Sequence, residues 1–160
     1  MLVRHYRPSD APALLRLLRE TVRAVNSRDY SPAQIEAWAP ESLDLALWAR
    51  RCETHITLVA EAEGDILGFI LLRRNGYLDC LYCHKHHQRR GVGGQLYEAA
   101  AGRALDLGLT RLWVEASITA LPFFESMGFT GRQVQTVRRR GQTFLNYYLE
   151  KDLTGTHPNS

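Results

Sequence analysis

The sequence predicts one α/β domain built around a mixed β-sheet. The 160 residues are 45% hydrophobic and 23% charged, a composition typical of one globular domain with a substantial core. Helical periodicity near the start gives way to short strands in the middle, and a strand, a helix and a strand then follow in order. Because that last succession favours a right-handed parallel crossover, we expect parallel as well as antiparallel strand pairs.

The first part of the chain is expected to contain a short strand and three helices. The strand covers Val3 to Tyr6, and Ser9-Asp10 caps a helix whose apolar residues recur at helical spacing. Ser31-Pro32-Ala33-Gln34 is a capping box with proline at the first helical position, which predicts a second helix that ends at Pro40. A third helical run covers roughly Ser42 to Cys52.

An antiparallel meander of three strands is expected next. The strands are predicted at Ile56–Ala60, Ile66–Leu72 and Tyr77–Cys83. Turn-forming residues separate them, Glu63-Gly64-Asp65 at the first turn and Asn75-Gly76 at the second. Because each connection is short, successive strands should run in opposite directions.

The last part of the chain is predicted to alternate between helix and strand and to end in a hairpin. Its segments in order are a helix that ends at Gly108, a strand at Arg111–Ala116, a short helix at Pro122–Met127, and a hairpin of Phe129–Arg138 and Thr143–Leu149 about Arg140-Gly141. Residues 154–160 are polar and are expected to form a disordered tail. The domain is therefore predicted to span residues 1–153.

The charge of the chain is mildly basic and evenly spread. Twenty Lys and Arg against 17 Asp and Glu give a formal net charge of +3, without the concentrated basic patch that is typical of nucleic-acid binding. A phosphate-rich small ligand suits this balance as well. No stretch approaches the length of a membrane span, and no apolar block follows the charged start, so we expect a cytoplasmic protein without a membrane partner.

The cysteines indicate a reducing compartment and no metal site. Cys52, Cys80 and Cys83 are too few, and odd in number, for a disulfide framework. Cys80-Leu81-Tyr82-Cys83-His84 matches a haem-attachment pattern and has the residue types of a zinc site. On a strand, however, Cys80 and Cys83 point to opposite faces and cannot bind one ion. We therefore expect neither metal nor haem, with the nearby histidines as solvated turn residues close to an anionic ligand.

The segment Gln88-Arg89-Arg90-Gly91-Val92-Gly93-Gly94 is the most informative in the chain. Its glycines let successive backbone N–H groups converge at the start of a helix, where a phosphate or pyrophosphate can bind, and Arg89 and Arg90 strengthen that attraction. The alternative is a tight strand-to-helix connection without a ligand. A Walker loop is not favoured because Gln95 follows Gly94, and a dinucleotide fingerprint is not favoured because Leu96 occupies its third small position.

Asp79 is a carboxylate within an otherwise apolar or aromatic strand. Such a group must be hydrated, paired or used, because uncompensated burial costs on the order of several kcal/mol. On a regular strand it shares a face with Leu81 and Cys83. Two interpretations stay open, namely an ion pair with an arginine of a neighbouring strand and a functional carboxylate just before the phosphate loop.

These elements in this order resemble the GCN5-related N-acetyltransferase (GNAT) family, over about Val3 to Asp152. The cofactor loop of that family, Gln/Arg-x-x-Gly-x-Gly/Ala, is similar to Gln88-x-x-Gly91-x-Gly93. Its second motif, Asn-x-x-Ala-x-x-Phe-Tyr-Glu-x-x-Gly-Phe, resembles the segment from Ser117 to Phe129. The two motifs together carry the resemblance.

The resemblance implies a fold and a cofactor. The fold is a single-domain, mixed and mostly antiparallel sheet, flanked by helices, whose parallel central strands splay apart. Acetyl-CoA is the implied acetyl donor, with its pyrophosphate on the backbone amides of residues 89–94 and its pantetheine arm beside Leu81 and Cys83. The implied cofactor-binding residues are Leu81, Cys83, Gln88, Arg89, Arg90, Gly91, Val92, Gly93, Gly94 and Ser117.

The resemblance also implies direct attack of a neutral amine, on a small molecule or a peptide, at the thioester. Amines are mostly protonated near neutral pH, so a base must take a proton. Asp79 falls where histone-type members of the family keep a catalytic carboxylate, and it is the predicted catalytic residue. Phe124 replaces the tyrosine that usually protonates the leaving thiolate, and Ser117 replaces an asparagine. The thiolate then leaves without an acid, or a substitute acts in its place: Tyr82, Tyr147, Tyr148 or Cys80.

Residues 30–40 are similar to a segment of small, poorly characterised bacterial members of the family. In the family this region caps the acceptor pocket. Tyr30 and Trp38 are therefore expected either to form an aromatic wall for the substrate or to anchor a helix in the core.

Two alternative functions stay open at this point. The departures at Ser117 and Phe124 leave a non-catalytic, CoA-binding regulatory module as one of them. A basic nucleic-acid-binding domain is the other, from outside the family. The sequence leaves the acceptor amine unidentified and the oligomeric state open, a homodimer included.

Overall fold

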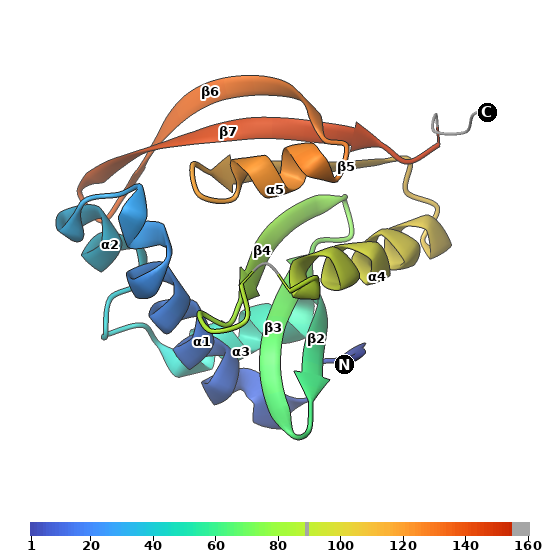
Figure 1. Cartoon of the computed structure of the whole chain (residues 1–160), viewed down its shortest axis with the longest axis horizontal. Coiled ribbons are helices and arrows are strands. Elements are labelled where there is room, and N and C mark those ends of the chain that lie inside the picture. Colours follow the sequence, from blue (N-terminus) through green and yellow to red (C-terminus); the bar gives the residue numbers. More distant parts are fainter. Residues whose placement is uncertain (89, 155–160) are drawn as a thin grey trace.

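The computed structural model describes residues 1–88 and 90–154 as a seven-stranded mixed sheet with helices on both faces (Figure 1). The elements in chain order are β1 (Leu2–His5), α1 (Ala11–Ala24), α2 (Pro32–Trp38), α3 (Leu45–Thr54), β2 (Ile56–Ala62), β3 (Asp65–Leu72), β4 (Tyr77–Cys83), α4 (Val92–Asp106), β5 (Arg111–Ser117), α5 (Leu121–Ser126), β6 (Thr130–Arg139) and β7 (Gln142–Asp152). Short 3-10 turns at Pro8–Asp10 and Asn26–Arg28 flank α1.

The strand order is β1-β2-β3-β4-β5-β7-β6. Only β4 and β5 pair in parallel among the described strands, and the other neighbours are antiparallel. This confirms the predicted mixed, mostly antiparallel sheet. The last strand, β7, lies between β5 and β6, a placement that the order of elements in the sequence does not reveal.

Capping residues fix where two of the helices begin. At α2, Ser31 Oγ accepts a hydrogen bond from the Gln34 N–H at 3.2 Å, and Gln34 Oε1 accepts one from the Ser31 N–H at 2.8 Å. This is the predicted capping box. Asp44 Oδ1 accepts a bond from the Ala46 N–H at 2.8 Å, so α3 begins at Leu45 rather than near Ser42.

Each face of the sheet has its own hydrophobic core. One core, the α4–α5 cluster, includes the fully buried Leu96 and Leu112. The other, the α1–α3 cluster, includes the fully buried Leu14 and Phe69. Figure 1 shows α1, α2 and α3 grouped to one side of β4 and α4 to the other. Within residues 1–88 and 90–154, no helix combines the length and apolar character needed to cross a membrane.

The parallel strands β4 and β5 pair over two positions only. Tyr77 lies beside Trp113, and Leu78 lies beside Val114. Beyond these residues β4 stays paired with β3, while β5 stays paired with β7 as far as Ser117. We call the separation that opens beyond Leu78 and Val114 the split. It corresponds to the splay of the central strands that the family resemblance implies.

A β-bulge at Asp79 determines which β4 side chains face each helical layer. Leu71 pairs with Cys80 and Leu72 with Leu78, so Asp79 is an additional residue without a partner on β3. Beyond the bulge, Cys80 packs in the α1–α3 cluster, whereas Leu81 and Cys83 pack against the α4–α5 cluster. The opposite orientation of Cys80 and Cys83 is thus confirmed.

The same bulge overturns one expectation about Asp79. A regular strand would place it on the face of Leu81 and Cys83, but its carboxylate bonds to Arg51 of α3, on the opposite face. The expectation was wrong because side-chain alternation stops at a bulge.

The β6–β7 hairpin extends over α2 (Figure 1). Its turn is the predicted Arg140-Gly141, both with positive φ. Two side-chain bonds hold the tip on α2: Arg140 Nη1 donates to the Ala37 carbonyl at 2.7 Å, and Gln34 Nε2 donates to the Thr143 carbonyl at 2.8 Å. The hairpin and α2 therefore close the far end of the split.

Gly68 provides a test of how closely α4 packs on the sheet. A methyl group at Gly68 would lie 2.8 Å from the Tyr82 carbonyl oxygen and 3.1 Å from the side chains of Val92 and Leu96. We expect Gly68→Ala to lower the free energy of unfolding by about 1–3 kcal/mol. The control is Gly102→Ala on the exposed side of α4, which meets nothing within 4 Å and should raise it by about 0.5–1 kcal/mol. Urea denaturation measures both, and equal effects would contradict the tight packing.

Candidate functional site

The glycine-rich segment predicted to bind phosphate lies at the N-terminus of α4. Gly91 is the N-cap residue, with a φ of +81°, and its carbonyl accepts a bond from the Gln95 N–H at 3.0 Å. The N–H groups of residues 92–94 therefore have no acceptor within the helix. They lie at the positive end of a 15-residue helix, a position that favours anionic groups, and binding of a pyrophosphate there stays a prediction.

The three glycines of this segment have different surroundings. A Cβ at Gly91 or Gly94 meets no atom within 4 Å, so a ligand can approach the backbone there. A Cβ at Gly93 would lie 3.2 Å from the Phe123 ring and 3.4 Å from Cys83 Sγ. Gly93 thus lets the start of α4 pack against α5 and the end of β4.

The other predicted residues of the segment differ in what they offer a ligand. Gln88 Nε2 donates to the Cys83 carbonyl at 2.6 Å, so its side chain holds the turn after β4. The Val92 side chain is buried in the core, and Arg90 is exposed. Arg89 lies outside the described residues. Their roles toward a cofactor stay predictions.

Three histidines precede the glycines. The His84 ring lies 5.3 Å from the ring of His86 and 5.3 Å from that of His87. Burial, helped by the charges of His87 and His86, lowers the pKa of His84. In the part of the chain that the structure describes, no group of His, Cys, Asp and Glu side chains could hold a metal ion.

The strand β4 directs backbone groups of Leu81 and Cys83 into the split. The His84 N–H donates to the Leu67 carbonyl at 2.7 Å, which in an antiparallel ladder turns the backbone groups of residues 80 and 82 toward β3. Those of Leu81 and Cys83 then face β5. The Cys83 carbonyl also accepts a bond from Thr21 Oγ1 at 3.1 Å. An extended ligand chain can pair with β4 here as an added strand would.

Asp79 is surrounded by two arginines and a histidine. Its Oδ1 accepts a bond from Arg51 Nη2 at 2.7 Å, and its Oδ2 lies 2.8 Å from His55 Nε2 and 3.5 Å from Arg73 Nη2. Burial by itself raises the pKa of Asp79, but the hydrogen bonds from His55 and Arg51 and the charges of Arg51 and Arg73 outweigh it and hold the pKa well below its usual range. A general base works best with a pKa near the operating pH. These contacts therefore favour the ion-pair interpretation, and the catalytic role stays a prediction.

We expect Asp79→Asn to lower the free energy of unfolding at pH 7 by about 2–4 kcal/mol, because Arg51 and His55 lose a buried partner. Since the folded-state pKa is depressed, this stabilisation is complete above the unfolded value of about 3.9 and is lost as the pH falls below it. Thermal unfolding should show a smaller Tm difference between the variant and the wild type at pH 3 than at pH 7. The exposed Asp65→Asn is the matched control. If Asp79 is instead the base, kcat falls more than about 100-fold.

Tyr30 anchors α2 to the C-terminal strands. Its side chain is buried, and its hydroxyl donates to the Leu145 carbonyl at 2.9 Å and accepts a bond from the Ile118 N–H at 2.9 Å. Trp38 is half-buried, lies edge-on to Tyr30 at 5.3 Å, and donates from Nε1 to Tyr82 Oη at 3.2 Å. These contacts favour the anchoring interpretation for Tyr30, while contact of either ring with a substrate stays a prediction.

Removal of the Tyr30 hydroxyl tests this anchor. Tyr30→Phe leaves the buried Ile118 N–H and Leu145 carbonyl without that partner, and should lower the free energy of unfolding by about 1–3 kcal/mol. Tyr6→Phe is the matched control, because the buried Tyr6 hydroxyl has no hydrogen-bond partner among the described residues and its loss should be neutral or slightly stabilising. Chemical denaturation gives both values, and similar effects would rule out the anchor.

Phe124 and Ser117, the two departures from the family motif, both make structural contacts. Phe124 is buried, with its ring 5.2 Å from Phe123 and 5.3 Å from Phe129. Ser117 Oγ accepts a bond from the Ala120 N–H at 3.0 Å and so helps to start α5. Position 124 thus contributes packing, and any acid must come from elsewhere.

The four candidate substitutes lie on different faces of the sheet. Cys80 and Tyr82 pack on the α1–α3 side, where burial raises the pKa of Cys80 to about 12. Tyr148 donates to Glu150 at 3.0 Å. Tyr147 packs against the α4–α5 cluster, which also contains Phe124. Among the four, Tyr147 therefore lies on the face of the missing tyrosine.

Sequence reasoning missed Glu115. It is the first β5 residue beyond the pairs with β4, on the face opposite Val114. Tyr77 Oη donates to Glu115 Oε1 at 3.0 Å, and Gln135 Nε2 donates to Oε2 at 2.6 Å. A polar position in an alternating strand was visible in the sequence, but its place beside the split depends on the register with β4.

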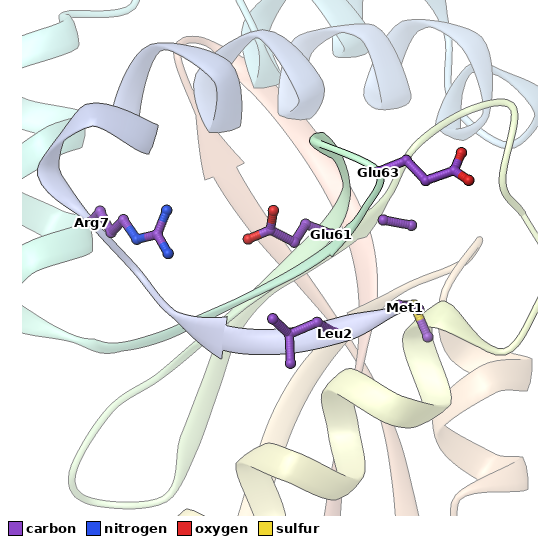
Figure 2. A pocket seen from close by; sticks show the side chains of 6 residues that line it. Met1, Leu2, Arg7, Glu61 and Glu63 are labelled. Atoms are coloured by element: carbon purple, nitrogen blue, oxygen red, sulfur yellow. The ribbon is translucent and has the colours of Figure 1, made fainter.

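A surface hollow lies away from these residues. Figure 2 shows it beside β1 and the turn between β2 and β3. Its lining consists of Met1, Leu2, Arg7, Glu61, Ala62 and Glu63. None of these was predicted to act in the site, and the strand order places β1 at the edge of the sheet, three strands from the split.

Comparisons with known proteins agree with this architecture. A family model described as an acetyltransferase (GNAT) domain matches residues 26–151. The chain belongs to the GNAT family. A curated relative, the uncharacterized N-acetyltransferase YafP of Escherichia coli (strain K12), is 35% identical over 147 residues, which cover 92% of this chain and 93% of that protein. Its family and this N-acetyltransferase relative identify the protein as an acyltransferase.

Solved structures share the fold. A GCN5-related N-acetyltransferase from Rhodopseudomonas palustris superposes with a TM-score of 0.91 at 32% identity, over 94% of each chain. The PaiA N-acetyltransferase of Thermoplasma acidophilum, in complex with coenzyme A, gives 0.75 at 19% identity, over 94% of this chain and 98% of that one. YncA of Salmonella typhimurium, with its cofactor acetyl-CoA, gives 0.71 at 18% identity, over 96% and 94%.

Proposed function

We propose that this GNAT member transfers an acetyl group from acetyl-CoA to a primary amine of a small molecule or peptide. The observation that carries the proposal is the position of the α4 N-terminus next to the split in the sheet. The anion site of residues 91–94 and the backbone of Leu81 and Cys83 lie on consecutive parts of the chain. Structures of the same fold from T. acidophilum and S. typhimurium contain coenzyme A or acetyl-CoA, which supports this donor.

The donor would extend along the residues that the sequence predicted. Its pyrophosphate would accept bonds from the N–H groups at Gly91 to Gly94, aided by the exposed Arg90. Its pantetheine arm would pair with Leu81 and Cys83 in the split. The thioester would then lie between β4 and β5, with one side open toward the face of Glu115.

The reaction needs only the two substrates and proton acceptors and donors. The amine nitrogen attacks the thioester carbonyl carbon, the new N–C bond forms and the C–S bond breaks. The nitrogen loses a proton to a base or to water, and the departing thiolate gains one. Backbone N–H groups of β4 would stabilise the carbonyl oxygen, and Tyr147 is the phenol on the appropriate face. We assign Asp79 to holding Arg51 and His55 in place.

The cofactor site can be tested with two glycines at opposite ends of α4. Gly91 and Gly108 have φ values of +81° and +78°, and a Cβ at either meets nothing within 4 Å. Glutamate therefore imposes similar backbone strain at both positions, but only Gly91→Glu brings a negative side chain to the anion site. We expect Gly91→Glu to weaken acetyl-CoA binding by at least about 100-fold in calorimetry. Gly108→Glu should bind as wild type does, and equal affinity in both variants would contradict the site.

A CoA-binding regulatory module without turnover is the second candidate function, because Phe124 lacks the hydroxyl of the family's acid. Thiol release from acetyl-CoA with a panel of primary amines separates the two. Binding of acetyl-CoA without acetylation of any amine would favour the module.

A further inference from the structure

Three arginines from separate elements lie near β4 on the face of the sheet opposite α4 and α5. Arg51 belongs to α3, Arg73 follows β3, and Arg139 ends β6. Arg51 Nη2 lies 3.3 Å from Cys80 Sγ, just beyond the start of the split. Burial raises the pKa of the Cys80 thiol, and the nearby charges of Arg51, Arg139 and Arg73 all oppose that rise. The contacts of the hairpin agree with this placement, because Arg140, next to Arg139, bonds to the Ala37 carbonyl and the adjacent Trp38 bonds to Tyr82 of β4. The three arginines therefore lie near one short segment of β4.

The positive charge of this cluster exceeds the negative charge within it. Asp79 pairs with Arg51 and Arg73. Arg139 is exposed and takes part in no ion pair among residues 1–88 and 90–154. Arg139 lies on the same face of β6 as Gln135, which precedes it by four residues. Gln135 in turn bonds to Glu115. The cluster thus carries an excess of two positive charges beside the split, and no further carboxylate of residues 1–88 and 90–154 forms an ion pair with it.

A negative side chain lies on the β5 side of the split, on the same face of the sheet as the arginines. Glu115 is on β5 and on the same face as Trp113, whose ring stacks 4.3 Å from that of Tyr77 of β4. Its two oxygens are oriented by Tyr77 and Gln135. A primary amine reaches the protein as an ammonium ion near neutral pH, so Glu115 provides an attractive charge for it at the opening of the split.

We propose that the acceptor is an amine that also carries a carboxylate, which Arg139 and Arg51 bind while the amino group lies over Glu115. A guanidinium group fits a carboxylate with two parallel hydrogen bonds, a geometry that a single point charge does not offer. The inference rests on the proposed function and adds the substrate class to it. It accounts for the presence of both the arginine cluster and Glu115 on the face of the sheet away from the cofactor segment.

Matched acceptors test this specificity. Thiol release is measured with straight-chain ω-amino acids and with the alkylamines of equal length, such as 4-aminobutyrate beside butylamine, whose amino groups have similar basicity. We expect kcat/KM for the carboxylate to exceed that for the plain amine by at least about tenfold at one or more chain lengths, a preference of the size that one charge-assisted pair supplies.

Substitutions of two arginines in the same hairpin distinguish direct binding of the carboxylate from a general effect of positive charge. Arg139→Gln should reduce kcat/KM for the carboxylate by at least about tenfold, mainly through KM, and change that for butylamine far less. Arg138→Gln removes the same charge, but Arg138 bonds to Thr143 and Gly141 within its own hairpin, so the preference should persist. The proposal is overturned if plain amines match the carboxylates at every length, or if the two variants behave alike.

Failure of the proposed function gives a different result. If acetyl-CoA binds but no amine is acetylated, the function fails, and the acceptor site is tested by binding alone. With CoA bound, at least one ω-amino acid of the series should raise the Tm of the wild type and of Arg138→Gln but not that of Arg139→Gln. An equal response of the three proteins would overturn the inference.

Discussion

The short parallel contact between β4 and β5 is the constraint on which the rest of the structure depends. The strands share two residue pairs and then follow different partners, β3 on one side and β7 on the other. The bulge at Asp79 falls where they part, and an ion pair to Arg51 and a hydrogen bond to His55 hold it against the C-terminal end of α3. Since the bulge resets alternation, Leu81 and Cys83 face the layer that contains α4. The glycine segment before α4 and the edge of β4 that faces the split thereby lie on the same side of the sheet.

The far end of the split is closed by contacts of another kind. There α2 joins the β6–β7 hairpin through Gln34, Ala37 and the buried hydroxyl of Tyr30. The split is thus bounded by backbone pairing at one end and by side-chain bonds at the other. The two faces of the sheet differ at the split: one carries a helix N-terminus, and the other carries an arginine cluster and Glu115.

The sequence predicted those features that depend on local patterns. The capping box at Ser31, the turn at Arg140-Gly141 and the glycine segment before α4 each need only neighbouring residues, and each is present. Features that depend on register were missed or misplaced. Arg51 and Asp79 are 28 positions apart, and Tyr30 bonds to a residue 115 positions away, so periodicity could not pair them. The face of Asp79 and the place of Glu115 likewise follow from a bulge and a two-residue register.

The brevity of the β4–β5 contact also divides the sheet mechanically. Strands β1 to β4 form one slab and strands β5 to β7 another. Backbone pairing joins the slabs over two residue pairs only, while the α4–α5 cluster packs across both and α2 links them at the far end. An extended ligand bound between the slabs would supply hydrogen bonds to the edges of β4 and β5 where they lack a neighbouring strand. Its binding would therefore reduce the bending of one slab against the other.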